Sequence, residues 1–378
     1  MKMMHPRRTL VAAGLAAVGA AAARRHAWAQ DSAGPLRIAV VGPMTGQLAA
    51  LGSQFRAGAE QAVADLNAAG GVMGRKVALE VADDACDPRQ AVSVANQLVG
   101  RGTVFVAGHA CSGSSIPASK VYGEEGVLQI SPATTNPDFT EKGGWQTFRV
   151  CGRDDQQGQV AGRYLADRFR DARIAVLHDN SAYGKGLAEE TTRAMQSAGV
   201  KPALTSVYTP GERDYGALVS RLKAAQIGVI YVGGYHTEAA LILRQAKEQG
   251  MNPILFGGDA LVVQEFWQIA GTSGEGTLMT FTPDPRERPD AAPVVQRLRA
   301  AGREADGYVL YTYAAIQVWA EAAGKAGTVQ PRKVAAMLKS GGPWQTVIGP
   351  LTFDAKGDLS QPSFSVHAWR GGKLVPVS

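Results

Sequence analysis

Short apolar runs alternate with amphipathic stretches along the chain. Runs typical of buried strands occupy 36–41, 77–82, 104–107, 127–130, 174–177, 229–232 and 254–256. Between these runs, apolar residues recur at helical spacing within 52–69, 88–99, 185–198 and 237–249. Strands of this kind separated by helices predict parallel sheets with helices on both faces. The fold class is therefore α/β with doubly wound sheets, and the pattern restarts near residue 174.

Polar loops follow three of the predicted strands, at 109–115, 131–137 and 179–184. The carboxyl ends of parallel strands meet at one edge of a sheet, which is where open α/β sheets bind ligands. Ser and Thr hydroxyls beside free N–H groups at helix starts suit a carboxylate. Any one of these residues could instead be a plain helix N-cap. Because two of the loops follow adjacent strands, the sequence favours a shared anion site.

The first 29 residues read as a secretory signal. Lys2, Arg7 and Arg8 precede an uncharged run at 9–23, and 27–29 has the small-x-small pattern of a cleavage site. The run is shorter than the roughly 18 residues of a membrane span. We expect export to the periplasm and a soluble mature chain that begins near residue 30. The paired arginines leave the twin-arginine and the general export routes both open.

Removal of this segment changes the charge balance. The net charge of +6 falls to +1, because five of the 39 basic residues and none of the 33 acids lie in it. No basic patch then indicates a nucleic-acid partner. The length of 378 residues fits two or three domains, and the 45 glycines indicate many tight turns.

Export also bears on the three cysteines. Cys86 follows the second predicted strand and Cys111 follows the third, so both lie in neighbouring loops at one sheet edge. An oxidising compartment favours a disulfide between them that braces the binding loops, and two buried free thiols are the alternative. Cys151 is then unpaired, and we expect a small buried apolar role for it. The cysteines and histidines have no metal-site spacing.

The familiar catalytic and nucleotide-binding motifs are missing from the sequence, which argues against an enzyme and against a cofactor. His109, Ser112 and either Asp83 or Asp84 could be imagined as a hydrolase triad near one sheet edge. Their spacing has no specific feature, and His109 is as easily a packing residue. The sequence favours a binding protein.

Four longer stretches, at 58–67, 83–88, 231–236 and 349–359, carry a family resemblance. With them the chain resembles the bacterial periplasmic leucine/isoleucine/valine-binding proteins, which serve ABC transporters. The resemblance implies a type I periplasmic binding fold, in which a hinge of three strands joins two lobes. The lobes close over a ligand that is bound between them. It places lobe one at 36–150 plus 283–348 and lobe two at 151–282 plus 349–378. It further implies a small-molecule ligand, a membrane permease as partner, and a monomer.

The resemblance also assigns the binding residues. Ser112, with the backbone of Ala110 and Cys111, matches the group that receives the ligand carboxylate. The remaining matches are Ala133 and Thr135 for the amino-acid head group, Tyr183 and Tyr235 for closure over the ligand, and Asp259 for the ammonium. The family has a glutamate at this last position, so the acid here is one methylene shorter.

Two further positions bear on the choice of ligand. Leu51 stands where the family has an aromatic pocket residue, and Tyr308 matches another aromatic near the pocket. Leu51 could instead be an apolar residue at the start of a helix, and Tyr308 could be an aromatic residue of the core. A smaller wall at Leu51 would admit varied side chains, so we expect a hydrophobic, branched-chain L-amino acid. The same fold with an aromatic acid, an amide or another small solute, and a sensory protein that presents its ligand to a receptor, stay open as alternatives.

Overall fold

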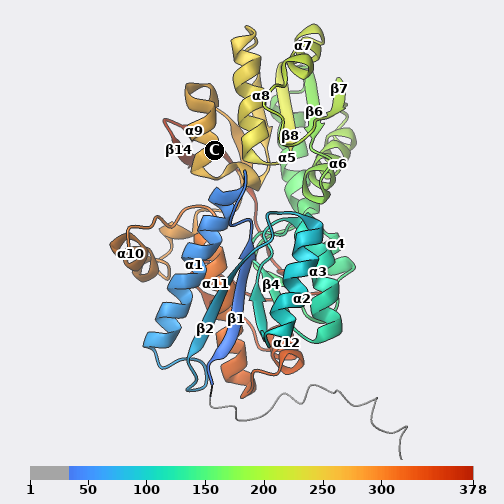
Figure 1. Cartoon of the computed structure of the whole chain (residues 1–378). Coiled ribbons are helices and arrows are strands. Elements are labelled where there is room, and N and C mark those ends of the chain that lie inside the picture. The colour runs from blue at the N-terminus through green and yellow to red at the C-terminus, as the bar shows by residue number, and fades with distance from the viewer. Residues whose placement is uncertain (1–33, 378) are drawn as a thin grey trace, which may run out of the picture. The chain divides into compact units, whose positions relative to one another are not determined.

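The computed structural model describes residues 34–377, and its elements follow one another as strands and helices in alternation (Figure 1). The predicted secretory signal at 1–29 lies outside these described residues. Within 34–377, no helix combines the length and the apolar character needed to cross a bilayer.

The first sheet holds five parallel strands in the order β2-β1-β3-β4-β5. Their bounds are Leu36–Gly42 for β1, Val77–Asp83 for β2, Phe105–Ala107 for β3, Leu128–Ser131 for β4 and Thr147–Arg149 for β5. The chain runs from β1 to one side and then returns to place β3 on the other side. The sheet order therefore reverses between β1 and β3, which is the position where open α/β sheets bind ligands.

Six helices pack around this sheet. They are α1 (Ala49–Ala68), α2 (Pro88–Gly100), α3 (Ser112–Glu125), α4 (Asp138–Glu141), α11 (Val309–Ala326) and α12 (Pro331–Ser340). The α2 helix begins where the Asp87 side chain accepts the N–H groups of Arg89 and Gln90. Figure 1 shows α11 and α12, late in the chain, returning beside the early strands. There the Trp319 ring stacks on Phe105 with 4.8 Å between centroids.

The second sheet has the order β14-β13-β10-β9-β8-β6-β7. Its parallel strands are β6 (Ile174–His178), β7 (Leu204–Val207), β8 (Val229–Gly233), β9 (Ile254–Gly257) and β10 (Leu278–Phe281). The edge strands β13 (Ser365–Arg370) and β14 (Lys373–Pro376) run antiparallel. Gly371 and Gly372 turn this hairpin with φ of 54° and 77°. The predicted parallel sheet is confirmed, and this antiparallel hairpin extends it at one edge.

Helices also cover the second sheet. They are α5 (Asp154–Arg168), α6 (Ala182–Ser197), α7 (Gly216–Ala224), α8 (His236–Glu248) and α9 (Gln264–Ala270). The α5 and α6 helices approach closely at Gly158, where an added Cβ would lie 2.6 Å from the Cβ of Glu190. A third group comprises α10 (Ala292–Ala300), which packs on α1, and the short helices η1 (Asp259–Leu261), η2 (Gly271–Gly274) and η3 (Pro285–Glu287).

The chain passes between the two sheets after β5, after β10 and before β13. A buried ion network joins the first and third passages. Asp358 accepts hydrogen bonds from Arg149 Nε (2.7 Å), Arg153 (2.6 Å) and the Thr140 hydroxyl (2.8 Å). Arg149 is fully buried and also donates to the Thr134 carbonyl at 2.6 Å. The network therefore couples these passages to the loop that follows β4.

A small hairpin precedes the third passage. Its strands β11 (Trp344–Thr346) and β12 (Gly349–Leu351) pair antiparallel. Phe353 continues from β12 and packs edge-on against Phe148 of the first sheet, with 5.3 Å between ring centroids. The lobe limits given above stay a prediction. The pairing of β11 with β12 argues for placing 349–359 with lobe one.

The predicted elements match the structure closely. Each of the seven predicted strands is present, with ends that differ by one residue at most, and the four predicted helices begin and end within about three residues of expectation. Many other elements were not predicted, among them β5, β7, α5 and all the helices and strands after β9. The β5 strand has only three residues, and α5 is strongly polar, so neither shows a clear apolar repeat.

Candidate functional site

A cavity lies at the carboxyl ends of the strands, between residues of the two sheets and their helices. It is lined by Leu51, Ala110, Ser112, Ala133, Tyr183, Tyr235, Asp259, Ala260 and Tyr308. Its free volume is about 20 Å³. Typical ligand sites measure roughly 300–1,000 Å³. A solute the size of an amino acid would therefore enter only if the walls separate.

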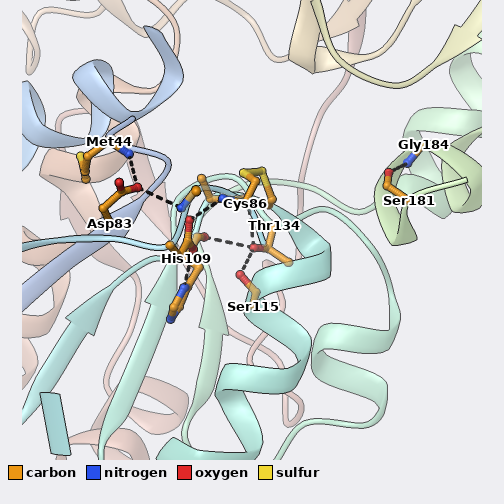
Figure 2. The surroundings of a disulfide bond; sticks show 12 residues. Met44, Asp83, Cys86, His109, Ser115, Thr134, Ser181 and Gly184 are labelled. Atoms are coloured by element: carbon orange, nitrogen blue, oxygen red, sulfur yellow. Dashed lines mark hydrogen bonds and ion pairs between the residues drawn. A yellow bond between two sulfur atoms is a disulfide. The ribbon is translucent and has the colours of Figure 1, made fainter. Parts of the chain in front are cut away.

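One wall of the cavity comes from the loop that joins β3 to α3. Cys111 is the N-cap of α3 and forms the predicted disulfide with Cys86, with their Cα atoms 5.6 Å apart (Figure 2). Ser112 is the first residue of the helix, so its N–H belongs to the first turn, which has no partner inside the helix. The disulfide confirms that the loops after β2 and β3 are neighbours. It holds the residue directly before Ser112 in place.

The buried side chain of His109 connects the same loop to Asp84 and to α3. Its Nδ1 lies 2.6 Å from Asp84 Oδ2, and its Nε2 lies 3.0 Å from the Tyr122 hydroxyl. Asp84 also accepts the Cys86 N–H at 2.9 Å. Both ring nitrogens of His109 are thus engaged away from Ser112. The imagined hydrolase triad is not formed, and the packing role of His109 is the one that the geometry supports.

A second wall follows β4. Ser131, Thr134 and Ser115 bond to one another, with 2.8 Å between the Ser131 and Thr134 hydroxyls and 2.5 Å between those of Ser115 and Thr134. These hydroxyls shape the loop and are fully buried. Thr135 differs, because its buried hydroxyl has no hydrogen-bond partner among the described residues. Ala133 lines the cavity and Thr135 lies two residues further along the same loop.

The opposite wall is centred on Asp259, the first residue of η1 after β9. Its Oδ1 accepts hydrogen bonds from the Tyr183 hydroxyl at 2.8 Å and from Gln157 Nε2 at 2.9 Å. The Tyr308 hydroxyl donates to Oδ2. Burial raises the pKa of Asp259, while the bonds from Tyr308, Gln157 and Tyr183 act in the opposite direction. The Asp259 carboxyl group is therefore shielded from water and accepts three hydrogen bonds from side chains.

The tyrosines around Asp259 remain protonated. Burial raises the pKa of Tyr183, Tyr235 and Tyr308 well above its usual value, and the charge of Asp259 raises it further. The rings of Tyr183 and Tyr235 lie 5.2 Å apart, at the starts of α6 and α8. Ser181 caps α6 by accepting the Gly184 N–H at 2.9 Å (Figure 2). Of the three polar loops, this one thus uses its serine as a plain N-cap.

Eight of the ten predicted binding residues line the one cavity, including Leu51 and Tyr308. Cys111 and Thr135 are the exceptions. Cys111 stands between Ala110 and Ser112, and Thr135 follows Ala133 in the same loop, and these three neighbours line the cavity. Leu51 lies in the first turn of α1 and Tyr308 caps α11. The structure brings these positions together. Their contact with a ligand stays a prediction.

Sequence reasoning missed two polar residues beside the site, Gln157 and Asp154. Gln157 donates to both Asp259 and the Thr280 hydroxyl, the latter at 2.9 Å. Asp154 is fully buried, and its N–H donates to the Thr135 carbonyl at 2.9 Å. Both residues lie in the first turn of α5. Acids are usual at helix starts, so the sequence offered no signal that distinguishes Asp154 from a surface residue.

A model of the periplasmic binding protein family matches residues 35–373. The chain belongs to this family. Its members of known structure share the type I periplasmic binding fold, and the two doubly wound sheets described above agree with it.

Relatives that are named for the ligands they bind agree with that assignment. A Leu/Ile/Val-binding protein homolog from Brucella suis is 49% identical over 330 residues, which cover 87% of this chain and 89% of the relative. The crystal structure of a leucine-binding protein from Thermotoga maritima matches with a TM-score of 0.84 and 25% identity, over 91% of this chain and 98% of the other. A branched-chain amino acid transporter substrate-binding protein from Streptococcus pneumoniae, in complex with isoleucine, matches with a TM-score of 0.80 and 26% identity, over 90% and 97%.

Proposed function

We propose that this periplasmic binding protein captures a hydrophobic, branched-chain L-amino acid between its two lobes and delivers it to an ABC transporter. The site has two chemically different sides, and this observation carries the proposal. Hydroxyl and backbone N–H groups at the start of α3 suit a carboxylate. Asp259 on the opposite wall suits an ammonium, and Leu51 leaves an apolar space for an aliphatic side chain.

The head group of the ligand would lie between these two sides. Ser112 and the backbone of Ala110 and Cys111 would receive the carboxylate. Ala133 and Thr135 would contact the ammonium end, and the unpartnered Thr135 hydroxyl supports this role. Tyr183 and Tyr235 would close over the ligand from the second lobe.

Closure of the lobes is supported by bonds that connect the two sides of the cavity. The Tyr308 hydroxyl donates to Asp259, and Asn136 Nδ2 donates to the Ala182 carbonyl at 2.6 Å. The small free volume also fits a closed form. We infer a hinge at the three passages between the sheets, with lobes at 36–150 plus 283–359 and 151–282 plus 360–378. The boundary predicted at 348 moves to 359, because β12 pairs with β11.

The remaining features follow from family membership and sequence. We propose export to the periplasm by the segment at 1–29, a membrane permease as the partner, action as a monomer, and no enzymatic activity. The rival within the binding class is the same fold with an aromatic acid or an amide as ligand. Asp259 argues against it, because such a ligand has no ammonium to offset a buried carboxylate.

The proposal is tested by calorimetry on protein that has been unfolded and refolded to remove any co-purified ligand. The titrants are leucine, isoleucine, valine, phenylalanine, alanine, glutamate and benzoate. We expect tight binding of an aliphatic amino acid and no binding of benzoate. Binding of benzoate alone, or of none of the panel, would refute the proposed ligand class.

A further inference from the structure

Asn136 carries a side chain that joins the two proposed lobes beside the ligand site. It follows Thr135 in the loop after β4, and its Nδ2 donates to the Ala182 carbonyl in the first turn of α6 at 2.6 Å. In the proposed division, Asn136 belongs to lobe one and Ala182 to lobe two. Neither residue lines the cavity. The bond between them therefore has a role other than contact with the ligand.

The loop directs the Asn136 amide toward α6. Its Oδ1 accepts the Asp138 N–H at 2.9 Å, while Nδ2 faces the Ala182 carbonyl. The opposite orientation of the amide would set donor against donor and acceptor against acceptor. The bond to Asp138 thus fixes the side chain before it meets α6. Less rotamer entropy is lost when the lobes come together, because the side chain is already ordered.

The backbone of Asn136 connects it to the carboxylate side of the site and to the hinge. Its N–H donates to the Ser112 hydroxyl at 3.3 Å, and its carbonyl accepts Nη1 and Nη2 of Arg149, both at 3.1 Å. Arg149 in turn donates to Asp358 in the buried network at the passages between the sheets. Asn136 is therefore anchored in lobe one, and its side chain reaches the helix that begins with Ala182 and Tyr183.

The opposing helix leaves space for this amide. Gly186 lies one turn after Ala182 on α6, and a Cβ added at Gly186 would lie 2.8 Å from Asn136 Nδ2. Among the described residues, Asn136 alone has atoms within 4 Å of that position, apart from the helix itself and the chain neighbours of Gly186. Glycine is less favourable than alanine inside a helix. The glycine thus makes room for Asn136 at some cost in helix stability.

We propose that the bond from Asn136 to Ala182 is a latch, which forms when the lobes close and slows release of the ligand without contact with it. This inference rests on the proposed function. A ligand that enters and leaves through the open form is held longer by each bond that only the closed form contains. The latch shifts the equilibrium between the lobes, so its effect is the same for every ligand over which they close. Ser112 and Asp259 then select the ligand, and Asn136 sets the residence time.

The size of the effect follows from the loss of one hydrogen bond. The bond is exposed to solvent, so water replaces it when the lobes separate. A net contribution of this kind changes an equilibrium about three- to tenfold. In Gly186→Ala the new methyl group would turn Nδ2 away from the Ala182 carbonyl. This variant therefore removes the latch while Asn136 itself stays in place.

The test is a double-variant cycle on refolded, ligand-stripped protein with Asn136→Ala, Gly186→Ala and the two together. Calorimetry gives the dissociation constants for leucine, isoleucine and valine, and dilution of labelled leucine into excess unlabelled leucine gives its dissociation rate. We expect each single variant to bind leucine about three- to tenfold more weakly and to release it faster by the same factor. The double variant should bind no more weakly than the weaker single variant, because one contact is lost only once. The affinity ratios among the three amino acids should stay as in the wild type.

Asn96→Ala is the matched control. Asn96 is exposed on α2, and its Nδ2 donates to the Val92 carbonyl of the same helix at 2.8 Å. This variant should bind and release leucine like the wild type. Gly186→Ala should not lower the melting temperature of the ligand-free protein, because alanine favours a helix. Weaker binding in Gly186→Ala would then be due to the lost latch and not to a loss of folding.

The outcomes separate this inference from the proposed function. If the wild type binds leucine and Gly186→Ala keeps its affinity and dissociation rate, the bond is not a latch, and the proposed function stands. Additive losses in the double variant would show that the two residues act separately, which overturns the inference. A loss confined to one of the three amino acids would also overturn it, because a contact with the ligand would then have changed. If the wild type binds no member of the amino-acid panel, the proposed function itself fails, and the inference falls with it.

Discussion

At the scale of single residues, the site depends on Asp259. This acid is one methylene shorter than the glutamate that the family resemblance led us to expect, yet it is not left alone in the cavity wall. Tyr183, Gln157 and Tyr308 donate to it. They hold its two oxygens in fixed directions, and the buried surroundings strengthen its interaction with a cation.

Removal of this acid should greatly weaken binding. In Asp259→Ala the ligand ammonium would be buried without its main counter-charge, which costs roughly 3–5 kcal/mol when one member of a buried pair is lost. By that range, the dissociation constant for leucine should rise at least about 100-fold. Calorimetry on refolded protein gives the value directly.

Asp167→Ala is the matched control, because Asp167 is exposed on α5. It should bind leucine like the wild type. Unchanged affinity in Asp259→Ala would contradict the ammonium position, provided that the variant has the melting behaviour of a folded protein.

Some features of single residues could be predicted from the sequence, and others could not. The positions of Ser112 and Thr135 could be predicted, because each follows a buried strand and the carboxyl ends of parallel strands converge. The bond from Tyr308 to Asp259 could not, because the two residues are 49 positions apart and meet only through the fold. Asp154 had an ordinary surface interpretation in the sequence and is buried only because Thr135 and the start of α5 pack together.

At the scale of elements, the loops after β2, β3 and β4 act as one unit. The Cys86–Cys111 disulfide joins the first two, and hydroxyl bonds between Ser115 and Thr134 join the α3 helix to the third. The switch in strand order between β1 and β3 makes room for these loops. This arrangement was foreseeable from the alternation of strands and helices. The antiparallel hairpin β13–β14 was not, because nothing in its short runs separates an edge strand from a central one.

The disulfide yields a prediction at this scale. Thiol titration in denaturant without reductant should find one thiol per chain, that of Cys151, which is buried and has a raised pKa in the folded protein. The double variant Cys86→Ser, Cys111→Ser should lose about 3 kcal/mol of unfolding free energy, because the bridge closes a loop with a sequence separation of 25. Urea unfolding measures this loss.

Cys151→Ala provides the control for the thiol count. It keeps the bridge and should titrate with no thiol at all. Three thiols in the unreduced wild type would show that the bridge does not form in the protein.

At the scale of the whole molecule, two sheets with parallel strands and surrounding helices contribute residues to one proposed ligand site. Asp358 ties Arg149 to Arg153 at the passages between the sheets, so the loop that carries Thr135 is anchored to the proposed hinge. The alternation of elements indicated both sheets. The three passages came from the family resemblance and not from any compositional linker. The first contains the buried residues Val150 and Cys151, whereas the other two are largely polar and partly exposed, like ordinary loops.

The central claim is that the two sides of the site hold the two charged ends of one amino acid. Calorimetry on refolded wild-type protein can compare leucine with two analogues that each lack one end. These are 4-methylpentanoate, without the ammonium, and 3-methylbutylamine, without the carboxylate. Each analogue leaves buried polar groups of the site unpaired, so we expect at least about 100-fold weaker binding of both. Binding of 4-methylpentanoate as tightly as leucine would contradict the account.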